Sequence, residues 1–261
     1  MSGSQAPVAD SVQSLVRGLA VIRVFDADHA HLTLSEVARR ADLSRATARR
    51  VLHTLVALGY VATDGKEFSL RPRILELGHA YLSALGLPDV ATPHLERLRQ
   101  EVHESCSVAV LDDTDVVYVA REATSRIMTV AIHVGTRFPA HLTSMGRVLL
   151  AALPPADLDE VLSRVELEPV TPHTITDEAR LRGELRRIAG QGFAMVDQEL
   201  ELGLRSIAAP IRDASGTVCA AMNISASARR GTKTSIRTEL LPPLLSTAHA
   251  LEHDLALVQR H

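Results

Sequence analysis

The basic residues between Ser44 and His53 have types and a spacing suited to binding a nucleic acid. With helical spacing, Arg45, Arg49 and Arg50 share one face, while the apolar residues between them form the opposite, buried stripe. A guanidinium group can donate two hydrogen bonds to guanine in the major groove, and it also attracts the backbone phosphates. This segment is therefore predicted to be a helix that contacts double-stranded DNA.

The elements around this helix have the order of a winged helix-turn-helix. Residues 33–36 (TLSE) form a capping box that begins a short helix, and residues 42–43 make the turn after it. Ser44 is then the N-cap of the arginine-bearing helix. The pair Asp64–Gly65 predicts the turn of a following β-hairpin. A helix over residues 12–25 comes first, and the order leaves the second helix of the motif free to enter a major groove.

Two other interpretations of this head are a helical hairpin whose arginines form a solvated face, and a module that binds a protein instead of DNA. Salt distinguishes the last from DNA binding, because binding to a duplex weakens steeply as salt rises. In the DNA-binding interpretation, Ser44 and the amides after it seat the helix on phosphate, and Lys66 in the wing meets phosphate or the minor groove. The predicted DNA-binding residues are Thr33, Ser44, Arg45, Ala46, Thr47, Arg49, Arg50 and Lys66.

The charge balance changes along the chain. Residues 1–73 hold ten Lys and Arg against seven Asp and Glu, whereas residues 74–261 hold 18 against 24. A mildly basic head on an acidic body predicts that the head meets a polyanion. Aromatic residues are 3% and Trp is absent, which argues against single-strand binding through stacked bases and favours a duplex.

The composition excludes several classes of protein. The 261 residues are 46% hydrophobic and 23% charged, which is ordinary for a globular chain and not for a disordered or fibrous one. The apolar run Val148–Leu153 is far shorter than the roughly 20 residues that span a bilayer. Residues 1–13 lack the basic cluster and apolar core of a secretory signal. With two isolated cysteines, the sequence predicts a cytoplasmic protein that does not associate with membranes.

Changes of pattern predict four parts of the chain. They are a mobile tail (1–10), the winged helix-turn-helix domain (11–72), a linker helix (73–88) and a second domain (89–261). The linker carries an apolar stripe, which packs either on its own chain or against a second subunit. The second domain mixes short hairpin strands with helices, an α+β pattern. Its last helix covers residues 234–258, where Pro242 and Pro243 are expected to interrupt or delay it.

The strands of the second domain are predicted from short apolar runs between turn residues. Residues 135–141 are expected to be a loop that leads into a helix at 143–153. The predicted strands are 107–111, 116–120, 126–134, 205–212 and 217–225.

Polar residues within apolar segments of the second domain indicate a binding pocket for an anion. Asn223 interrupts an apolar strand, and a buried Asn needs partners, which either a ligand or the neighbouring backbone supplies. Ser144 stands where a helix begins, and the unpaired amides of a helix N-terminus suit an anion. Arg137, Arg147 and Arg205 are candidate partners for a carboxylate, and each is equally suited to an ion pair.

The sequence gives little support to enzyme or metal chemistry. No His-Glu-x-x-His motif or glycine-rich phosphate loop is present, and His29 and His31 have no cysteines nearby. Cys106 has no base assigned to it that would make it a nucleophile. The sequence therefore predicts no enzyme activity, no metal and no cofactor.

Motifs in both domains resemble those of the IclR-type (isocitrate lyase regulator) transcription factors. In the first domain they are residues 12–19 (VQSLVRGL), 34–38 (LSEVA) and 43–47 (LSRAT). In the second they are residues 192–194 (GFA), 203–210 (GLRSIAAP) and 220–225 (AAMNIS). The resemblance covers nearly the whole chain after residue 10.

This resemblance implies a winged helix-turn-helix domain, a linker helix and a GAF-like effector-binding domain that closes around a small carboxylate. It also implies a homodimer, often a dimer of dimers. The family commonly has Cys where Ser206 stands here, which leaves the identity of the ligand open. With the candidate arginines added to the pocket of the family, the predicted effector-binding residues are Ser144, Met145, Ser206, Asn223, Ser225, Arg137 and Arg147.

A narrower resemblance is to the branch that controls protocatechuate and β-ketoadipate catabolism. It rests on residues 12–15 (VQSL), 143–150 (TSMGRVLL) and 196–201 (VDQELE). It implies a transcriptional regulator of aromatic-acid catabolism whose effector is an aromatic or dicarboxylic acid. The expected partners are double-stranded operator DNA, that acid and, for an activator, RNA polymerase.

Overall fold

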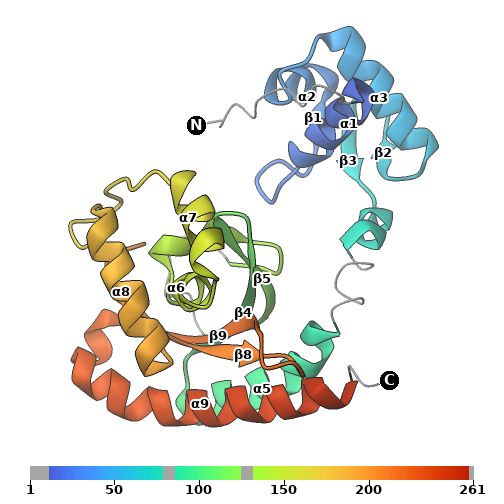
Figure 1. Ribbon diagram of the computed structural model, residues 1–261. Helices are drawn as coiled ribbons and strands as arrows, with labels where there is room; N and C mark the ends of the chain where they lie inside the picture. The colour runs from blue at the N-terminus through green and yellow to red at the C-terminus, as the bar shows by residue number, and fades with distance from the viewer. Residues whose placement is uncertain (1–11, 79–85, 125–131, 259–261) are drawn as a thin grey trace. The chain divides into compact units, whose positions relative to one another are not determined.

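The structure, a computed structural model, describes residues 12–78, 86–124 and 132–258 (Figure 1). The chain divides into two compact units, Met1–Tyr81 and Leu82–His261. The predicted tail, residues 1–10, lies outside the described residues, and so does segment 79–85 of the predicted linker helix. The described start of that linker is a 3-10 turn, η1 (Pro72–Ile74), followed by helical residues 75–78.

The N-terminal unit has the predicted winged helix-turn-helix order. Its small antiparallel sheet has the strand order β1-β3-β2, so the hairpin of β2 and β3 forms the wing. The buried side chains at its centre include Val21, Val37 and Leu52, one from each helix. The elements are α1 (Gln13–Arg23), β1 (Leu32–Thr33), α2 (Leu34–Arg40), α3 (Arg45–Ala57), β2 (Val61–Thr63) and β3 (Glu67–Leu70).

Local hydrogen bonds fix where α2 and α3 begin. The amide of Thr33 donates to the Glu36 carboxylate over 2.8 Å, and the amide of Glu36 donates to Thr33 Oγ1 over 3.4 Å. This is the predicted capping box. The amide of Thr47 donates to Ser44 Oγ over 3.2 Å, so Ser44 is the N-cap of α3.

An antiparallel sheet forms the centre of the C-terminal unit. Within the described residues its strand order is β6-β5-β4-β9-β8-β7, so β7 lies at an edge. The strands are β4 (Ser105–Asp112), β5 (Asp115–Glu122), β6 (Arg137–Pro139), β7 (Ala194–Asp197), β8 (Leu204–Arg212) and β9 (Val218–Ser227).

Helices cover both faces of this sheet (Figure 1). On the outer face, α5 (Leu87–Val102) and α9 (Lys233–Val258) pack on one apolar core. On the inner face, a second core lies beneath α6 (Ser144–Ala151), α7 (Pro155–Ser163) and α8 (Glu178–Gln191). The predicted α+β fold class is confirmed.

The prediction that two prolines interrupt the last helix is wrong. The helix α9 continues through Pro242 and Pro243 without a break. Each proline removes one amide donor, but Leu240 and Leu244 on either side of the pair are buried in the outer core. Burial of this apolar stripe offsets the hydrogen bonds that the prolines cannot make.

The segment before α6 also differs from the prediction. Residues 137–139, expected in a loop, form β6, which pairs with β5 through Val116 and Phe138. The ring of Phe138 packs edge-on against Tyr118 with centroids 5.8 Å apart, and this contact draws the segment onto the sheet. Pro139 is tolerated there because β6 is an edge strand. Most of the strand predicted at 126–134 lies outside the described residues.

Gly146→Ala is expected to destabilise the protein by about 1–3 kcal/mol, as overpacking generally does. A Cβ at Gly146 in α6 would overlap the backbone of Ala140, in the adjoining 3-10 turn η2 (Ala140–Leu142). Urea unfolding followed by circular dichroism measures the loss. Gly190→Ala in α8 is the control, because a Cβ there meets open space and alanine favours the helix. Equal unfolding free energies for the two variants would contradict this close packing of α6 on η2.

Candidate functional site

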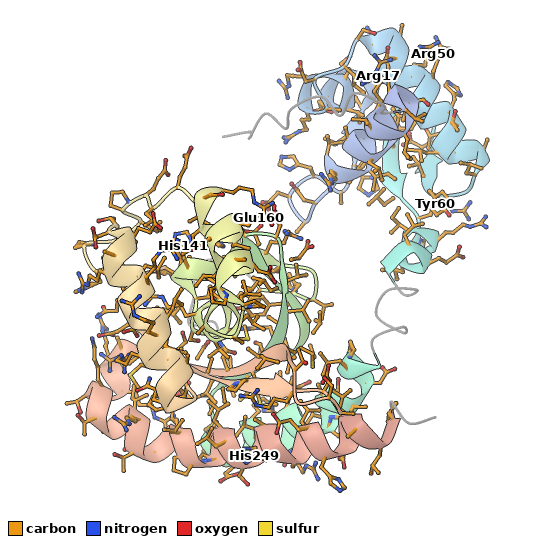
Figure 2. The ribbon with its side chains drawn as sticks, viewed as in Figure 1. Arg17, Arg50, Tyr60, His141, Glu160 and His249 are labelled. Carbon is orange, nitrogen blue, oxygen red and sulfur yellow. The ribbon has the colours of Figure 1, made fainter. Side chains whose placement is uncertain are left out.

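The exposed face of α3 carries the predicted DNA-binding arginines. Arg45, Arg49 and Arg50 are exposed there, and Figure 2 shows Arg50 at the outside of the N-terminal unit. Within the described residues, no carboxylate forms an ion pair with any of the three. The Nε atom of Arg49 lies 3.5 Å from Nε2 of His53. Cations without acidic partners remain available to phosphates and base edges.

The remaining predicted DNA-binding residues lie around this face. Ala46 is exposed and Thr47 is half-buried beside the N-cap. Lys66 is exposed in the wing, at a turn where the Asp64 carboxylate accepts its amide over 2.8 Å. The Thr33 hydroxyl donates to Glu36 within the capping box, so it holds the start of α2.

A small cavity opens on the inner face of the C-terminal sheet, beside three of the predicted effector-binding residues. Ser206, Asn223 and Ser225 line it, together with Tyr118 and the loop residue Leu200. Ser206 on β8 and Ser225 on β9 are cross-strand partners. The cavity volume is about 20 Å³, which is room for about one water molecule.

Buried polar atoms without partners lie at and near this cavity. The Asn223 amide donates to Ser225 Oγ over 3.0 Å, but Asn223 Oδ1 has no partner among the described residues. The same is true of Ser144 Oγ and of His141 Nδ1. Burial, with the nearby Arg147 guanidinium, lowers the pKa of His141 to about 4, so its ring is neutral at pH 7. An unpaired buried polar atom costs about 1–3 kcal/mol, which a polar ligand can recover.

Ser144 and Met145 begin α6, at the place that the sequence predicted. Thr143 lines the cavity and caps this helix, because the amide of Gly146 donates to its Oγ1 over 2.9 Å. Ser144 and Met145 are both buried, but neither lines the cavity.

The three arginines proposed as carboxylate partners already have acidic partners. Arg137 is outside the cavity lining and pairs with Asp112 and Asp115, at the turn between β4 and β5. Arg205 Nε donates to Asp197 over 2.7 Å, and its Nη1 donates to the Gly231 carbonyl.

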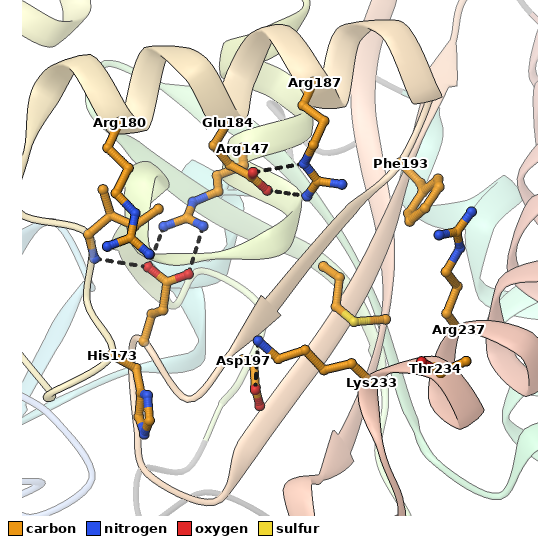
Figure 3. A pocket seen from close by; sticks show the side chains of 13 residues that line it. Arg147, His173, Arg180, Glu184, Arg187, Phe193, Asp197, Lys233, Thr234 and Arg237 are labelled. Carbon is orange, nitrogen blue, oxygen red and sulfur yellow. Dashed lines mark hydrogen bonds and ion pairs between the residues drawn. The ribbon is translucent and has the colours of Figure 1, made fainter.

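The third, Arg147, is buried in a bidentate pair with Glu199 (Figure 3). Its Nη1 and Nη2 donate to the two carboxylate oxygens over 2.7 and 2.6 Å, and its Nε donates to the His141 carbonyl over 2.8 Å. The Glu199 carboxylate also accepts the amide of Ile175 over 3.1 Å. The pair therefore connects α6, η2 and the turn that carries Leu200 over the cavity.

Arg121 is a candidate that the sequence reasoning missed. It is half-buried on β5, where burial lowers its pKa, and its Nη1 donates to Ser107 Oγ over 3.1 Å. Ser107 is the cross-strand partner of both Arg121 and Asn223, so the three form one row across the sheet. Arg121, like Arg137, is outside the cavity lining, but no carboxylate among the described residues forms an ion pair with it.

A β-bulge explains why the alternation of inward and outward side chains, counted along the sequence, does not predict that Arg121 faces inward. Residues three apart on a regular strand face opposite sides of a sheet. The register of β4 and β5 shifts by one residue, so that Val108 pairs with Ala120 and Ala109 pairs with Tyr118. This shift places Tyr118 and Arg121 on the same, inner face.

Glu199→Gln is expected to lower the free energy of unfolding by about 3 kcal/mol, because it leaves the buried Arg147 cation without a counter-charge. Urea unfolding measures this loss. Glu160→Gln (Glu160 is labelled in Figure 2) is the control, since its pair with Arg164 spans 3.7 Å between exposed side chains and contributes less than about 1 kcal/mol. A similar small loss in both variants would contradict the assigned role of the buried pair.

Other chemistry in the described residues is limited. Burial raises the pKa of Cys106 to about 12, so its thiolate is scarce at neutral pH. No cluster of His, Cys, Asp and Glu in the described ranges has a geometry suited to a metal ion. Among the helices of those ranges, none has the length and apolar character needed to span a membrane.

Comparison with known proteins places both units in one family. Residues 14–65 match the IclR helix-turn-helix domain, and residues 79–253 match the C-terminal domain of the bacterial transcriptional regulator IclR. The chain is 45% identical over 247 residues to the Pca regulon regulatory protein of Pseudomonas putida, covering 94% of this chain and 85% of that one.

Two further relatives are named for, or solved with, an aromatic acid. The p-hydroxybenzoate hydroxylase transcriptional activator of Acinetobacter baylyi is 35% identical, with 97% of this chain and 95% of that one covered. An IclR homologue of Microbacterium hydrocarbonoxydans, solved in complex with 4-hydroxybenzoate, is 32% identical, with a TM-score of 0.82 and 93% and 98% of the two chains covered. The resemblance found in the sequence is thus confirmed: the chain belongs to the IclR family of bacterial transcriptional regulators.

Proposed function

We propose that this protein is a DNA-binding regulator of aromatic-acid catabolism by the β-ketoadipate pathway, and that a small aromatic or dicarboxylic acid modulates it. The names of its relatives and the solved 4-hydroxybenzoate complex support the proposal. The observation that carries it is the inner-face row of Arg121, Ser107 and Asn223, where a half-buried cation lies in line with an unpaired amide oxygen. A regulator of this kind acts in the bacterial cytoplasm.

The proposed contact with DNA is made by α3 and the wing. The unpaired amides at the start of α3, beside Ser44, receive a phosphate, because a helix N-terminus attracts anions. Arg45, Ala46, Thr47 and Arg49 face base edges, and Arg50 contacts both bases and backbone. Lys66 meets the backbone or the minor groove beside the wing, and Thr33 holds α2 against the DNA. A dimer would place two such helices about one helical turn of DNA apart, or a multiple of that.

Arg45→Ala or Arg49→Ala is expected to weaken operator binding by about 1–3 kcal/mol, with relaxed base preference, if each reads a guanine. Fluorescence anisotropy with an operator duplex at several salt concentrations measures both the affinity and its salt slope. Arg186→Ala, an exposed arginine of α8 in the C-terminal unit, is the control and should bind normally. Unchanged affinity in both α3 variants would refute this assignment.

The proposed effector site extends from Arg121 along the inner face of the sheet. The guanidinium of Arg121 has donors left after its bond to Ser107, and these fit a carboxylate in bidentate fashion. Asn223, Ser206 and Ser225 then face the rest of the acid. Because the cavity is only about 20 Å³, its walls must move apart to admit an aromatic ring.

The other predicted effector-binding residues, Ser144, Met145, Arg137 and Arg147, have different roles in this proposal. Ser144 and Met145 supply the first turn of α6 beside the cavity, as the resemblance to the family implied. Arg147 acts indirectly, because it holds Glu199 in the cavity wall. Arg121 takes the carboxylate-binding part that the sequence suggested for Arg137 and Arg147.

Arg121→Gln is expected to lower the affinity for 4-hydroxybenzoate about 10- to 100-fold, because it removes a charge-assisted hydrogen bond. Isothermal titration calorimetry measures the dissociation constant. Arg137→Gln is the matched comparison, and the proposal expects it to bind nearly as the unchanged protein does. The reverse pattern would assign the carboxylate to Arg137 instead.

We also propose that the protein is a homodimer that can assemble further into a dimer of dimers, with RNA polymerase as a partner if it activates transcription. The N-terminal unit supports this with exposed apolar side chains on α1, including Leu15 at 62%, Val16 at 50% and Leu19 at 46% exposure. A cavity of about 580 Å³ lies among α1, α3 and Leu77 and has mostly apolar walls. An apolar surface of this kind is typical of an interface.

Leu15→Glu combined with Leu19→Glu is expected to raise the dimer dissociation constant at least about tenfold, because the charges would be desolvated at the interface. Sedimentation velocity over a concentration series gives the oligomeric state. Val170→Glu, at an exposed loop position of the C-terminal unit, is the control. Unaltered association in the α1 variant would remove α1 from the interface.

A further inference from the structure

We propose that the C-terminal unit contains a second ligand site, which binds a linear dicarboxylate and is separate from the effector cavity, the small cavity lined by Ser206, Asn223 and Ser225. The site is a groove of about 500 Å³ between α8 and the first turns of α9, beside the edge strand β7 (Figure 3). Glu199 is the single described residue that lines both this α8–α9 groove and the effector cavity. On β7, Met195 and Asp197 line the groove, whereas Val196 between them lines the effector cavity, as strand alternation requires.

The α8–α9 groove is positively charged within an acidic part of the chain. Residues 74–261 carry 18 basic against 24 acidic residues, yet the groove is lined by five Lys and Arg against three Asp and Glu. Three of the cations are neutralised within the groove, in the pairs Arg147–Glu199, Arg187–Glu184 and Lys233–Asp197.

Two cations are left over, Arg180 and Arg237, and they stand on opposite walls. Arg180 is on α8 and Arg237 is on α9, and Figure 3 shows them on either side of the groove. Neither forms a close ion pair among the described residues; the pKa of Glu184 is lowered mainly by its hydrogen bond with Arg187 and to a smaller extent by the charge of Arg180 on the same helix. Because the groove is lined by two more cations than carboxylates, these two separated guanidinium groups fit a ligand that carries one anionic group at each end.

The lining of the groove also has an apolar part. Phe193 is buried with the Arg237 guanidinium over its ring, 5.1 Å from the centroid. Met195 and Ile175 add further apolar lining, and Ile175 is buried. The exposed lining is mostly polar, so the choice of ligand rests on the two cations, which stand on opposite walls and suit a chain with a carboxylate at each end better than a compact anion such as phosphate.

The test is calorimetric titration of the full-length protein with adipate at low salt. We expect one adipate per chain to bind in the groove, and Arg180→Gln combined with Arg237→Gln to weaken this binding at least about tenfold. Arg186→Gln, on α8 but outside the groove lining, should bind as the unchanged protein does. Hexanoate, which keeps one carboxylate and the chain, should bind at least about tenfold more weakly than adipate.

Further measurements distinguish binding at this site from binding at the effector cavity, and they test whether the variants fold. Arg121→Gln should leave adipate binding at the groove unchanged while it weakens 4-hydroxybenzoate. Arg180 and Arg237 are exposed, so their double variant should retain the thermal unfolding midpoint, and each single variant serves as a second check. The proposal is overturned if adipate does not bind, if the double variant binds it normally, if Arg121→Gln alone abolishes binding, or if phosphate binds as tightly as adipate.

Discussion

The buried ion pair of Arg147 and Glu199 holds together the segments around the cavity of the C-terminal unit. Arg147 is 1% exposed and Glu199 is 7% exposed, so both charges have left water, which costs several kcal/mol per ion. The geometry compensates, because the guanidinium donates to both carboxylate oxygens and to the His141 carbonyl. Glu199 in turn accepts the Ile175 amide and offers its own carbonyl to Thr174. One pair thereby joins three segments that are distant in the sequence, at residues 141–147, 174–175 and 199.

The two faces of the C-terminal sheet have different roles because side chains alternate along each strand. The outer face buries Cys106, Ile224 and Ile207 beneath α5 and α9, and it provides stability through apolar burial. The inner face carries Arg121, Ser107 and Asn223 in the adjacent row. A polar row inside a sheet opposes stability unless it is hydrogen-bonded, and here it is satisfied only in part. This incomplete satisfaction is what marks the inner face as a place for a ligand.

Electrostatics separates the two units in a similar way. In the C-terminal unit, arginines such as Arg137, Arg182 and Arg230 have acidic partners, so their charges are largely neutralised within the fold. In the N-terminal unit, the α3 arginines have none among the described residues. The same residue type therefore stabilises one unit and leaves the other with cations available to a polyanion.

The sequence by itself determined the features that arise from neighbouring residues. The capping box of Thr33 and Glu36, the N-cap Ser44 and the turn at Asp64 each rest on bonds across two or three residues, so the N-terminal fold and its arginine face were predictable. Its motifs also identified the family. Tertiary structure decided the rest. Arg147 found its partner 52 residues away, a bulge turned Arg121 inward, and core packing carried α9 through two prolines. These features depend on which segments, distant in the sequence, pack against each other, and the spacing of neighbouring residues does not determine that.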